Sequence, residues 1–337
     1  MVRTLLRSKV LYGYRLLERY FVIAIDGRER LTFPARHCEH CLTQTHHGHT
    51  PYYHPVLEAK LVLPNGWVFS IMTEFIENPG AQPTKQACEL KAFYRLAQRL
   101  KQAFPRLPIC LSLDALFAGG PSMSICEADH WKYLIVLTEE DLPTVNSEFT
   151  ALLPLVPENQ LQVQTGVQYK THQDYRWVNA IPYVDSQNQE HTLAVLACVE
   201  DTPDADDQRK ATRFKWLTNF TVKITQVQIL ANDGGRIRWK IENEGFNMQK
   251  NVGYGLEHAY TRDPNASKVF YLLLQIAHLV AQLMEQGSVF RRAFPQGVGS
   301  AKNIAFRLLE AWRNLRVSAP NSYQLLSIRR QIRFQPP

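Results

Sequence analysis

Features that mark membrane proteins and secreted disulfide scaffolds are absent from this 337-residue sequence. No apolar run reaches the roughly 20 residues that a bilayer-spanning helix needs. The best candidate, residues 271–284, contains Gln275, His278 and Gln282, so we expect a buried helix there. The basic, amphipathic N-terminus has neither the continuous apolar core nor the small-residue cleavage site of a signal peptide. We therefore expect a cytoplasmic protein with no membrane partner.

Cysteine is scarce and mostly isolated. Of six cysteines, only Cys38 and Cys41 are close together, which argues against a secreted disulfide framework. Residues 119–124, GGPSMS, are glycine-rich but include no phosphate-loop lysine, so nucleotide binding is not expected. The chain also contains no internal repeat and no low-complexity segment.

Positive charge is concentrated towards the C-terminus. The whole chain has a net charge of +7, whereas residues 288–337 hold nine Lys and Arg residues against Glu310 alone. Arg291 and Arg292 open this region. Such basic regions bind polyanions, of which nucleic acid is the commonest; the alternative is a tail that serves solubility alone.

The apolar pattern predicts a mixed α+β protein. Apolar segments with strand or helix periodicity are separated by turn residues. The expected elements are strand 21–27 with a turn at Asp26-Gly27, hairpin strands 57–64 and 66–76, helix 85–104, strand 107–114, a helix near 121–128 and strand 131–137. Three antiparallel strands followed by alternating helices and strands give a mixed sheet, not a doubly wound one.

The second half of the chain changes from strands to helices. Three antiparallel strands are expected within 158–200, a returning strand at 213–220, a helix at 236–251, and two or three helices up to about residue 317. The predicted organisation is a basic N-terminal helix 1–20, a sheet domain 21–150 and 208–260, a β-rich insertion 151–207 and a basic helical region 261–337.

Three acidic residues occupy positions that a sheet can bring together. Asp26 and Asp114 each follow an apolar strand, and groups beyond strand ends converge on one crevice; Glu242 enters from a helix. Carboxylates held together repel unless a cation is present, and oxygen ligands favour Mg²⁺ or Mn²⁺. Two such ions can activate a water or a 3′-hydroxyl in phosphodiester chemistry.

Each acidic residue also has a simpler interpretation. Asp26-Gly27 can be a turn, Asp114 can cap a helix or turn, and Glu242 can form a solvated pair with Arg238, four residues before it. Glu244 competes with Glu242 for the third position. Helical phase groups Trp239 and Phe246 with Glu242, which favours Glu242.

The segments FVIAIDG, LPICLSLDALFA, WKYLIVL, FKWLTNF and RWKIENEGFNMQKN, in this order, resemble the catalytic domain of DDE insertion-sequence transposases over roughly residues 20–290. The resemblance implies a ribonuclease-H-like fold with Asp26, Asp114 and Glu242 in the catalytic, metal-binding roles. It also implies Mg²⁺ or Mn²⁺ as cofactor, and cleavage of double-stranded DNA at element ends followed by strand transfer. The expected enzyme is a homodimer on DNA in the bacterial cytoplasm or nucleoid.

The signature that such enzymes have around the Glu is only partly present. Arg238 and Glu242 match its Arg-to-Glu step, but Gly235 stands where an aromatic residue is expected, and Lys250 comes one place late. Arg238 is expected to grip a DNA phosphate. Trp239 can stack on a distorted base, or it can be a core indole. The other predicted DNA contacts are Lys250, Arg291 and Arg292.

Transposases usually recognise their ends through a module before the catalytic domain, and only about 20 residues precede FVIAIDG. End recognition by the basic C-terminal helices and a truncated copy are both open. The alternatives to a transposase are therefore a non-catalytic or truncated DNA-binding remnant and a nuclease of the same fold that cuts DNA without strand transfer.

The loop after the first strand contains half of a zinc site. Cys38 and Cys41 have CxxC spacing, and the histidines at 46, 47, 49 and 54 can complete the site; the prediction adopts His46 and His49. The alternative is a pair of reduced cysteines.

Overall fold

Ten strands in the described part of the chain form one mixed sheet, and the computed structural model is mixed α+β as predicted. It describes residues 1–36, 38, 41–43, 52–77, 85–166, 170–203, 208–261, 263–297 and 299–314. These divide into a sheet unit, Tyr14–Glu242, and a helical unit, Met1–Gly13 with Asn243–Pro337. Each unit is described by itself below.

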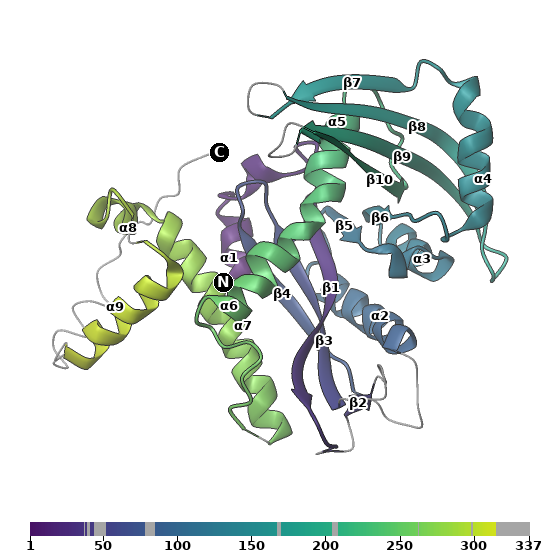
Figure 1. The fold of residues 1–337 in the computed structure, drawn as a ribbon. Helices are drawn as coiled ribbons and strands as arrows, with labels where there is room; N and C mark the ends of the chain where they lie inside the picture. Colours follow the sequence, from purple (N-terminus) through teal and green to yellow (C-terminus); the bar gives the residue numbers. More distant parts are fainter. Residues whose placement is uncertain are drawn as a thin grey trace. The chain divides into compact units, whose positions relative to one another are not determined.

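The strands follow the order β2–β3–β1–β5–β6–β10–β9–β8–β7, with β4 also paired to β3. Their bounds are β1 Phe21–Phe33, β2 Leu42–Thr43, β3 Tyr52–Val62, β4 Val68–Phe75, β5 Ile109–Leu113, β6 Lys132–Val136, β7 Gln160–Thr165, β8 Thr171–Val184, β9 Glu190–Pro203 and β10 Arg209–Thr218. β5 is parallel to both β1 and β6, and the other pairs are antiparallel. The predicted mixed sheet, in which antiparallel strands are followed by strands that alternate with helices, is therefore present (Figure 1).

The predicted turn at Asp26-Gly27 is wrong. β1 continues through both residues to Phe33, because its outer half pairs with β3 up to Phe33↔Tyr52, with an irregularity between Glu29 and Leu31. The predicted hairpin around Asn65-Gly66 is confirmed, and Gly66 supplies the positive φ of 91° that the turn requires.

The strands of residues 160–203 continue the main sheet. β10 pairs with β6 on one side and with β9 on the other, so β9, β8 and β7 extend the same sheet outward. α4 (Pro143–Leu152), a helix that the sequence analysis missed, leads through η3 (Leu153–Leu155) into β7.

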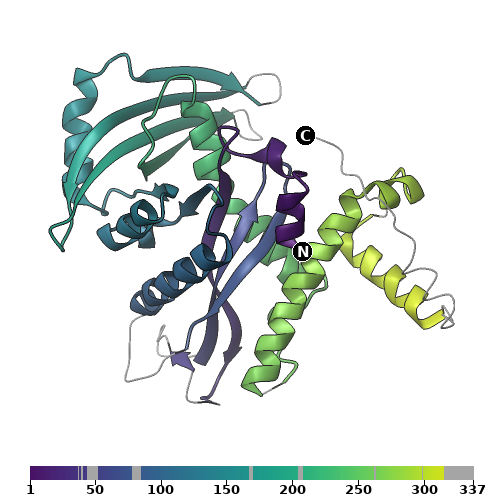
Figure 2. The ribbon, with the colours of Figure 1, turned by 180° about the vertical axis from the view of Figure 1, so that it is seen from behind.

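Helix α2 (Lys85–Ala103) covers one face of the sheet unit (Figure 2). Gly27 points to this side, because a Cβ built on it would lie 2.8 Å from Glu89 Oε1 of α2. Glu74 of β4 forms salt bridges with Arg95 and Arg99 of this helix, at 2.6 and 2.7 Å. α3 (Gly120–Ala128) follows η2 (Ala115–Phe117) and precedes β6.

The opposite face carries the chain from Val227 to Glu242. This segment winds irregularly as α5 (Val227–Ile229), η5 (Leu230–Gly235), η6 (Arg236–Trp239) and η7 (Ile241–Asn247), of which η5 and η7 are π-helical and η6 is 3₁₀. The predicted helix is thus confirmed but is not regularly α-helical. Wide π turns inside helices are frequent at functional sites.

Two glycines allow that segment to approach the sheet closely. A Cβ on Gly234 would lie 2.3 Å from Leu134 Cδ1, and one on Gly235 would lie 2.5 Å from Trp216 Cε2. Ser112 Oγ of β5 donates to the carbonyl oxygen of Gly234 at 2.8 Å. An aromatic residue at position 235, as in the transposase signature, would collide with the Trp216 ring.

The helical unit contains α1 (Val2–Arg7), α6 (Met248–Asn251), α7 (Pro264–Gln286), α8 (Ser288–Ala293) and α9 (Ala301–Asn314). The N-terminal helix is shorter than the predicted 1–20. Lys9, Leu17 and Glu18 adopt positive φ values of 61°, 50° and 58°, which are incompatible with a continuing right-handed helix.

Helix α7 is only partly buried. Gln275 and His278 are buried and bond Gln249 of α6 at 2.8 and 3.0 Å, whereas Leu273 is 57% exposed. The prediction of a buried helix therefore holds for one side only. Pro264–Glu285 is long and apolar enough to cross a membrane, but only 33% of its apolar window is buried, and core helices of folded proteins pass the same test.

Candidate functional site

Asp26 and Asp114 reach the same point of the sheet from neighbouring parallel strands. The β1–β5 register runs from Phe21↔Ile109 to Ala24↔Ser112, so a continuation by two residues sets Asp26 beside Asp114. Because side chains alternate along a strand, both face the same side as Ser112, which is the side covered by the helix 227–242. The two acidic residues therefore share one face of the sheet.

Glu242 joins them from η7. The charges of Asp114 and Glu242 both act to raise the pKa of Asp26, so both carboxylates lie within electrostatic range of it. Burial is the largest cause, and the pKa of Asp26 rises to about 6 despite the opposing effect of Arg238. Carboxylates from β1, the end of β5 and η7 thus surround one location.

Asp114 has two contacts that explain its position. Its Oδ1 accepts a hydrogen bond from the backbone N–H of Leu116 at 3.1 Å and so caps η2. Burial nevertheless raises its pKa, against the lowering effects of Arg238 and of the Leu116 N–H. The capping interpretation and the site interpretation of Asp114 are therefore compatible.

Arg238 is the positive charge of the site. Its Nη1 lies 3.7 Å from Asp26 Oδ2, and its side chain is only 11% exposed. The separation exceeds that of a hydrogen bond, and the buried Nε of Arg238 has no hydrogen-bond partner among the described residues. The guanidinium thus neutralises part of the acidic charge while keeping donors available.

Trp239 is not a core indole, because it is 53% exposed. Its ring centroid lies 5.4 Å from the guanidinium carbon of Arg238. Phe246, by contrast, is buried, so the phase argument that grouped the two aromatic residues is wrong. The turns of η6 and η7 depart from 3.6 residues, which changes the face on which each side chain emerges.

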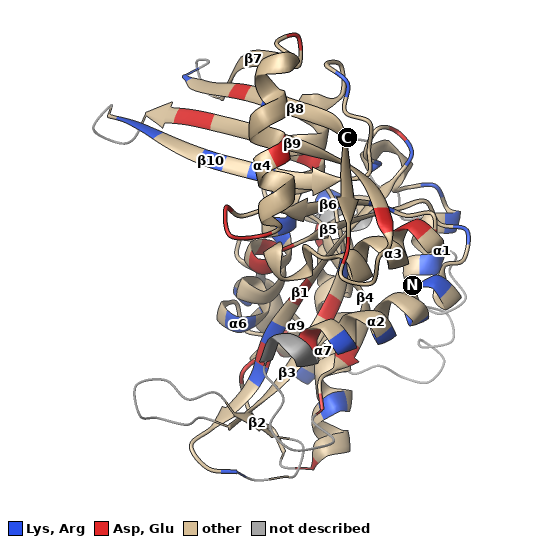
Figure 3. Cartoon of the chain, turned by 90° about the vertical axis from the view of Figure 1, so that its right-hand side faces the viewer, with Lys and Arg blue, Asp and Glu red and all other residues tan. Residues whose placement is uncertain are grey.

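The other predicted DNA contacts belong to the helical unit. Lys250 of α6 pairs with Glu257 at 2.9 Å, and Arg291 and Arg292 lie exposed on α8. Within the sheet unit, β10 carries cationic residues that the sequence analysis did not single out (Figure 3). They are Arg209, Lys210, Arg213 and Lys215.

A buried charged pair on β3 was also missed. Glu58, which is opposite Asp26 in the β1–β3 register, accepts hydrogen bonds from Ser70 at 2.6 Å and from Thr73. Burial lowers the pKa of Lys60 to about 8, against the opposing charge of Glu58. Two charged residues alternating within the apolar segment LEAKLV are the signal that could have identified this pair.

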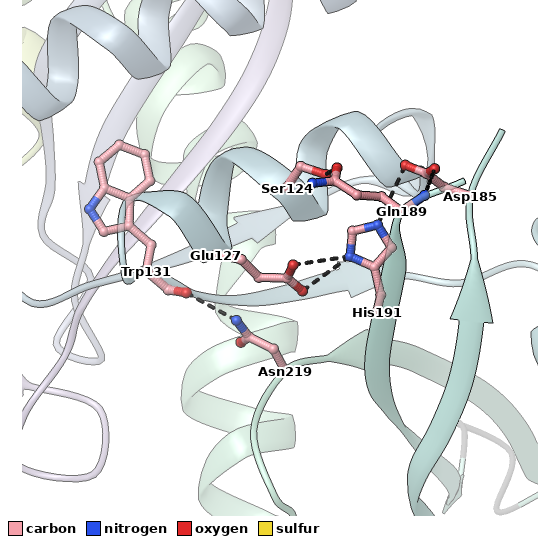
Figure 4. A network of polar contacts seen from close by, with 7 residues as sticks. All are labelled: Ser124, Glu127, Trp131, Asp185, Gln189, His191 and Asn219. Atoms are coloured by element: carbon pink, nitrogen blue, oxygen red, sulfur yellow. Dashed lines mark hydrogen bonds and ion pairs between the residues drawn. The ribbon is translucent and has the colours of Figure 1, made fainter. Parts of the chain in front are cut away.

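A second polar cluster contains a buried histidine between two carboxylates (Figure 4). His191 Nδ1 contacts Glu127 of α3 at 3.1 Å, and Nε2 lies 3.5 Å from Asp185. The backbone N–H groups of Gln189 and Gln187 hold the pKa of Asp185 below its usual value. Because each ring nitrogen has its own carboxylate and Asp185 also closes a turn, the cluster joins α3 to the β8–β9 hairpin.

Of the four predicted zinc ligands, two belong to the residues that the structure describes and two do not. Cys38 and Cys41 lie together beside His54, whereas His46 and His49 are outside the described residues. Among the described residues, the acidic location around Asp26 and the Cys38–Cys41–His54 cluster are separate.

Comparison of the chain with protein-family models finds no matching family, and comparison with curated proteins finds no match. Functional inference therefore rests on the chain's own residues and geometry.

Proposed function

We propose that the protein is a DDE-type transposase, which cuts double-stranded DNA at the ends of a mobile element and joins them to target DNA. The observation that carries the proposal is the gathering of Asp26, Asp114 and Glu242 on one face of the sheet, where burial and mutual repulsion raise the pKa of Asp26 to about 6. Charges held in this way favour binding of a cation.

The donor set suits Mg²⁺ or Mn²⁺. All three side chains offer carboxylate oxygens, which these ions prefer over the nitrogen and sulfur ligands typical of zinc. When bound, such ions activate a water or a 3′-hydroxyl and stabilise the leaving oxygen of a phosphodiester. Asp26, Asp114 and Glu242 are the residues that would hold them.

Arg238 and Trp239 support DNA as the substrate. A guanidinium can bind two phosphate oxygens at once, and the Nε of Arg238 has no partner among the described residues. The exposed Trp239 ring beside it offers a surface on which a base can stack. With a cation on the carboxylates, Arg238 would be released from Asp26 and could hold the scissile phosphate. Action as a homodimer in the cytoplasm is part of the same proposal.

The test uses linear DNA that ends in the sequences flanking the reading frame, with a supercoiled plasmid as target. We expect Mg²⁺- or Mn²⁺-dependent cleavage and joining by the wild type. Asp26→Asn, Asp114→Asn and Glu242→Gln should bind DNA and lose both activities, while Glu148→Gln, an exposed carboxylate on α4, should keep them.

Each other outcome contradicts part of the proposal. Metal-dependent nicking without joining would identify a nuclease instead. DNA binding without cleavage would identify a non-catalytic DNA-binding protein. Full activity of Glu242→Gln would show that the third metal ligand is a different residue. Glu244→Gln in the same assay would then test the competing carboxylate.

A further inference from the structure

Three soft or nitrogen ligands meet at one point near the outer end of β1 and β3. Cys38 Sγ lies 3.6 Å from Cys41 Sγ and 3.3 Å from His54 Nε2, and Cys41 Sγ lies 3.5 Å from the same nitrogen. Cys41 is buried, and the other two residues are partly buried. The three atoms therefore form a nearly equilateral triangle.

This triangle has the dimensions of one face of a tetrahedral zinc site. With Zn–S distances of about 2.3 Å and Zn–N distances of about 2.0–2.1 Å, tetrahedral angles give edges of about 3.8 Å for S to S and about 3.6 Å for S to N. The three observed separations agree with those edges to within about 0.3 Å. A disulfide would require the sulfurs to be about 2.05 Å apart, so the cluster is not a cystine.

The strand topology explains why these residues meet. β1 pairs with one edge of β3 and β2 with the other, so Cys38 and Cys41 stand where the chain passes from one edge of β3 to the other. His54 stands on β3 at this crossing, opposite Leu31 of β1. The CxxC spacing allows both thiols of the crossing segment to point at one imidazole.

We propose that Cys38, Cys41 and His54 bind a structural zinc ion that fastens this crossing to β3. Two thiolates and one imidazole are a ligand set that selects zinc over Mg²⁺ or Mn²⁺. The fourth tetrahedral position is taken by a water molecule or a further side chain. Leu31 is five residues beyond Asp26 on β1, roughly 17 Å along the strand, so this ion is distinct from any ion on the carboxylates. The proposal does not depend on transposase activity.

The experiment measures metal in the full-length protein purified without added chelator. We expect about one equivalent of zinc by inductively coupled plasma mass spectrometry. After replacement by Co²⁺, we expect thiolate-to-cobalt charge-transfer absorption and the intense bands of tetrahedral cobalt. Cys38→Ser, Cys41→Ser and His54→Ala should lose the metal and this spectrum. His172→Ala, a histidine on β8 distant in sequence from the cluster, should retain both.

Two further variants separate loss of metal from loss of folding. His54→Cys provides a third thiolate and should keep the zinc, whereas the double variant Asp26→Asn, Glu242→Gln should also keep it because the carboxylates are not its ligands. A chelator should lower the melting temperature of the wild type, with recovery on adding zinc, and should leave His54→Ala unchanged.

Zinc well below one equivalent in the wild type, together with no tetrahedral cobalt spectrum, would overturn the proposal. A Cys38–Cys41 disulfide in the native protein, found by mass spectrometry, would overturn it as well. In the same assay, His46→Ala and His49→Ala test the ligands that the sequence pattern suggested. Loss of zinc in one of these two variants would identify that histidine as the fourth ligand. Retention of zinc in both would mean that the fourth ligand is water or another side chain.

Discussion

Neutralising Asp26 should stabilise the metal-free protein while removing one carboxylate of the proposed metal site. The pKa of Asp26 is raised from 3.8 to about 6, mainly by burial. Because this pKa is about 2 higher in the folded than in the unfolded state, ionisation of Asp26 in both states destabilises the folded protein by roughly 3 kcal/mol. Asp26→Asn removes that ionisation, so its unfolding free energy at about pH 8 should exceed that of the wild type by about 2–3 kcal/mol.

The sign of the pH dependence follows from the direction of the shift. Because the folded state binds the Asp26 proton more tightly than the unfolded state, the contribution of Asp26 to stability is greatest below pH 3.8 and is lost as the pH rises through about 6. The advantage of Asp26→Asn should therefore fall to about half at roughly pH 5. Burial also raises the pKa of Asp114, which adds a slope of the same sign to both proteins.

The assay is urea denaturation and thermal unfolding in chelator, with Glu148→Gln as the matched exposed carboxylate. For a unit of this size, 2–3 kcal/mol corresponds to roughly 5 °C or more in melting temperature. Saturating Mn²⁺ should reverse the order, because the wild type gains the free energy of binding and Asp26→Asn does not. Protonation of Asp26 should likewise weaken Mn²⁺ binding as the pH falls below about 6.

The reasoning is refuted if Asp26→Asn is no more stable than the wild type at about pH 8 in chelator. An equal Mn²⁺ response in both proteins would separately exclude Asp26 as a ligand. Since Glu148 is exposed, a comparable gain in Glu148→Gln would show that the effect reflects net charge instead of the buried location.

Three further substitutions test the surroundings of the site. Gly235→Ala places a Cβ 2.5 Å from Trp216, so it should lower the free energy of unfolding in urea by about 1–3 kcal/mol and should also reduce DNA cleavage. Ile229→Ala, exposed on the same segment, is the control, and unchanged stability of Gly235→Ala would contradict this packing. His191→Ala removes the buried imidazole between the carboxylates of Glu127 and Asp185 and should cost about 2–4 kcal/mol, with a coupling to Glu127→Gln of at least about 0.5 kcal/mol in a double-mutant cycle. Additive effects would mean that the contact contributes nothing. Trp239→Ala should weaken single-stranded DNA binding by roughly tenfold in fluorescence anisotropy without changing stability, and equal affinity would exclude stacking.

Local pattern determined most of the elements of the sheet unit. The strands around Asn65-Gly66 and the helix α2 follow from turn chemistry and from apolar spacing, which act over a few residues. The same locality explains the failures. β1 continues beyond Asp26 because of pairing with a strand about 30 residues away, and no signal within FVIAIDG indicates that pairing.

The candidate site shows the same division. The sequence was enough to select the three carboxylates, because Asp26 and Asp114 each follow an apolar strand and Glu242 lies in a predicted helix. Their electrostatic coupling could not, since it depends on the β1–β5 register and on the close approach of Gly234 and Gly235 to the sheet.

The cluster of Cys38, Cys41 and His54 shows most clearly what tertiary structure adds. The sequence by itself determined that Cys38 and Cys41 are close enough to act together, because CxxC spacing acts within a single loop. Only the folded chain decided that His54 stands beside them, because the crossing of β3 between β1 and β2 brings a residue 13 positions beyond Cys41 to within 3.5 Å of its sulfur. Sequence spacing specifies which ligands can act together, whereas strand pairing specifies which ones meet.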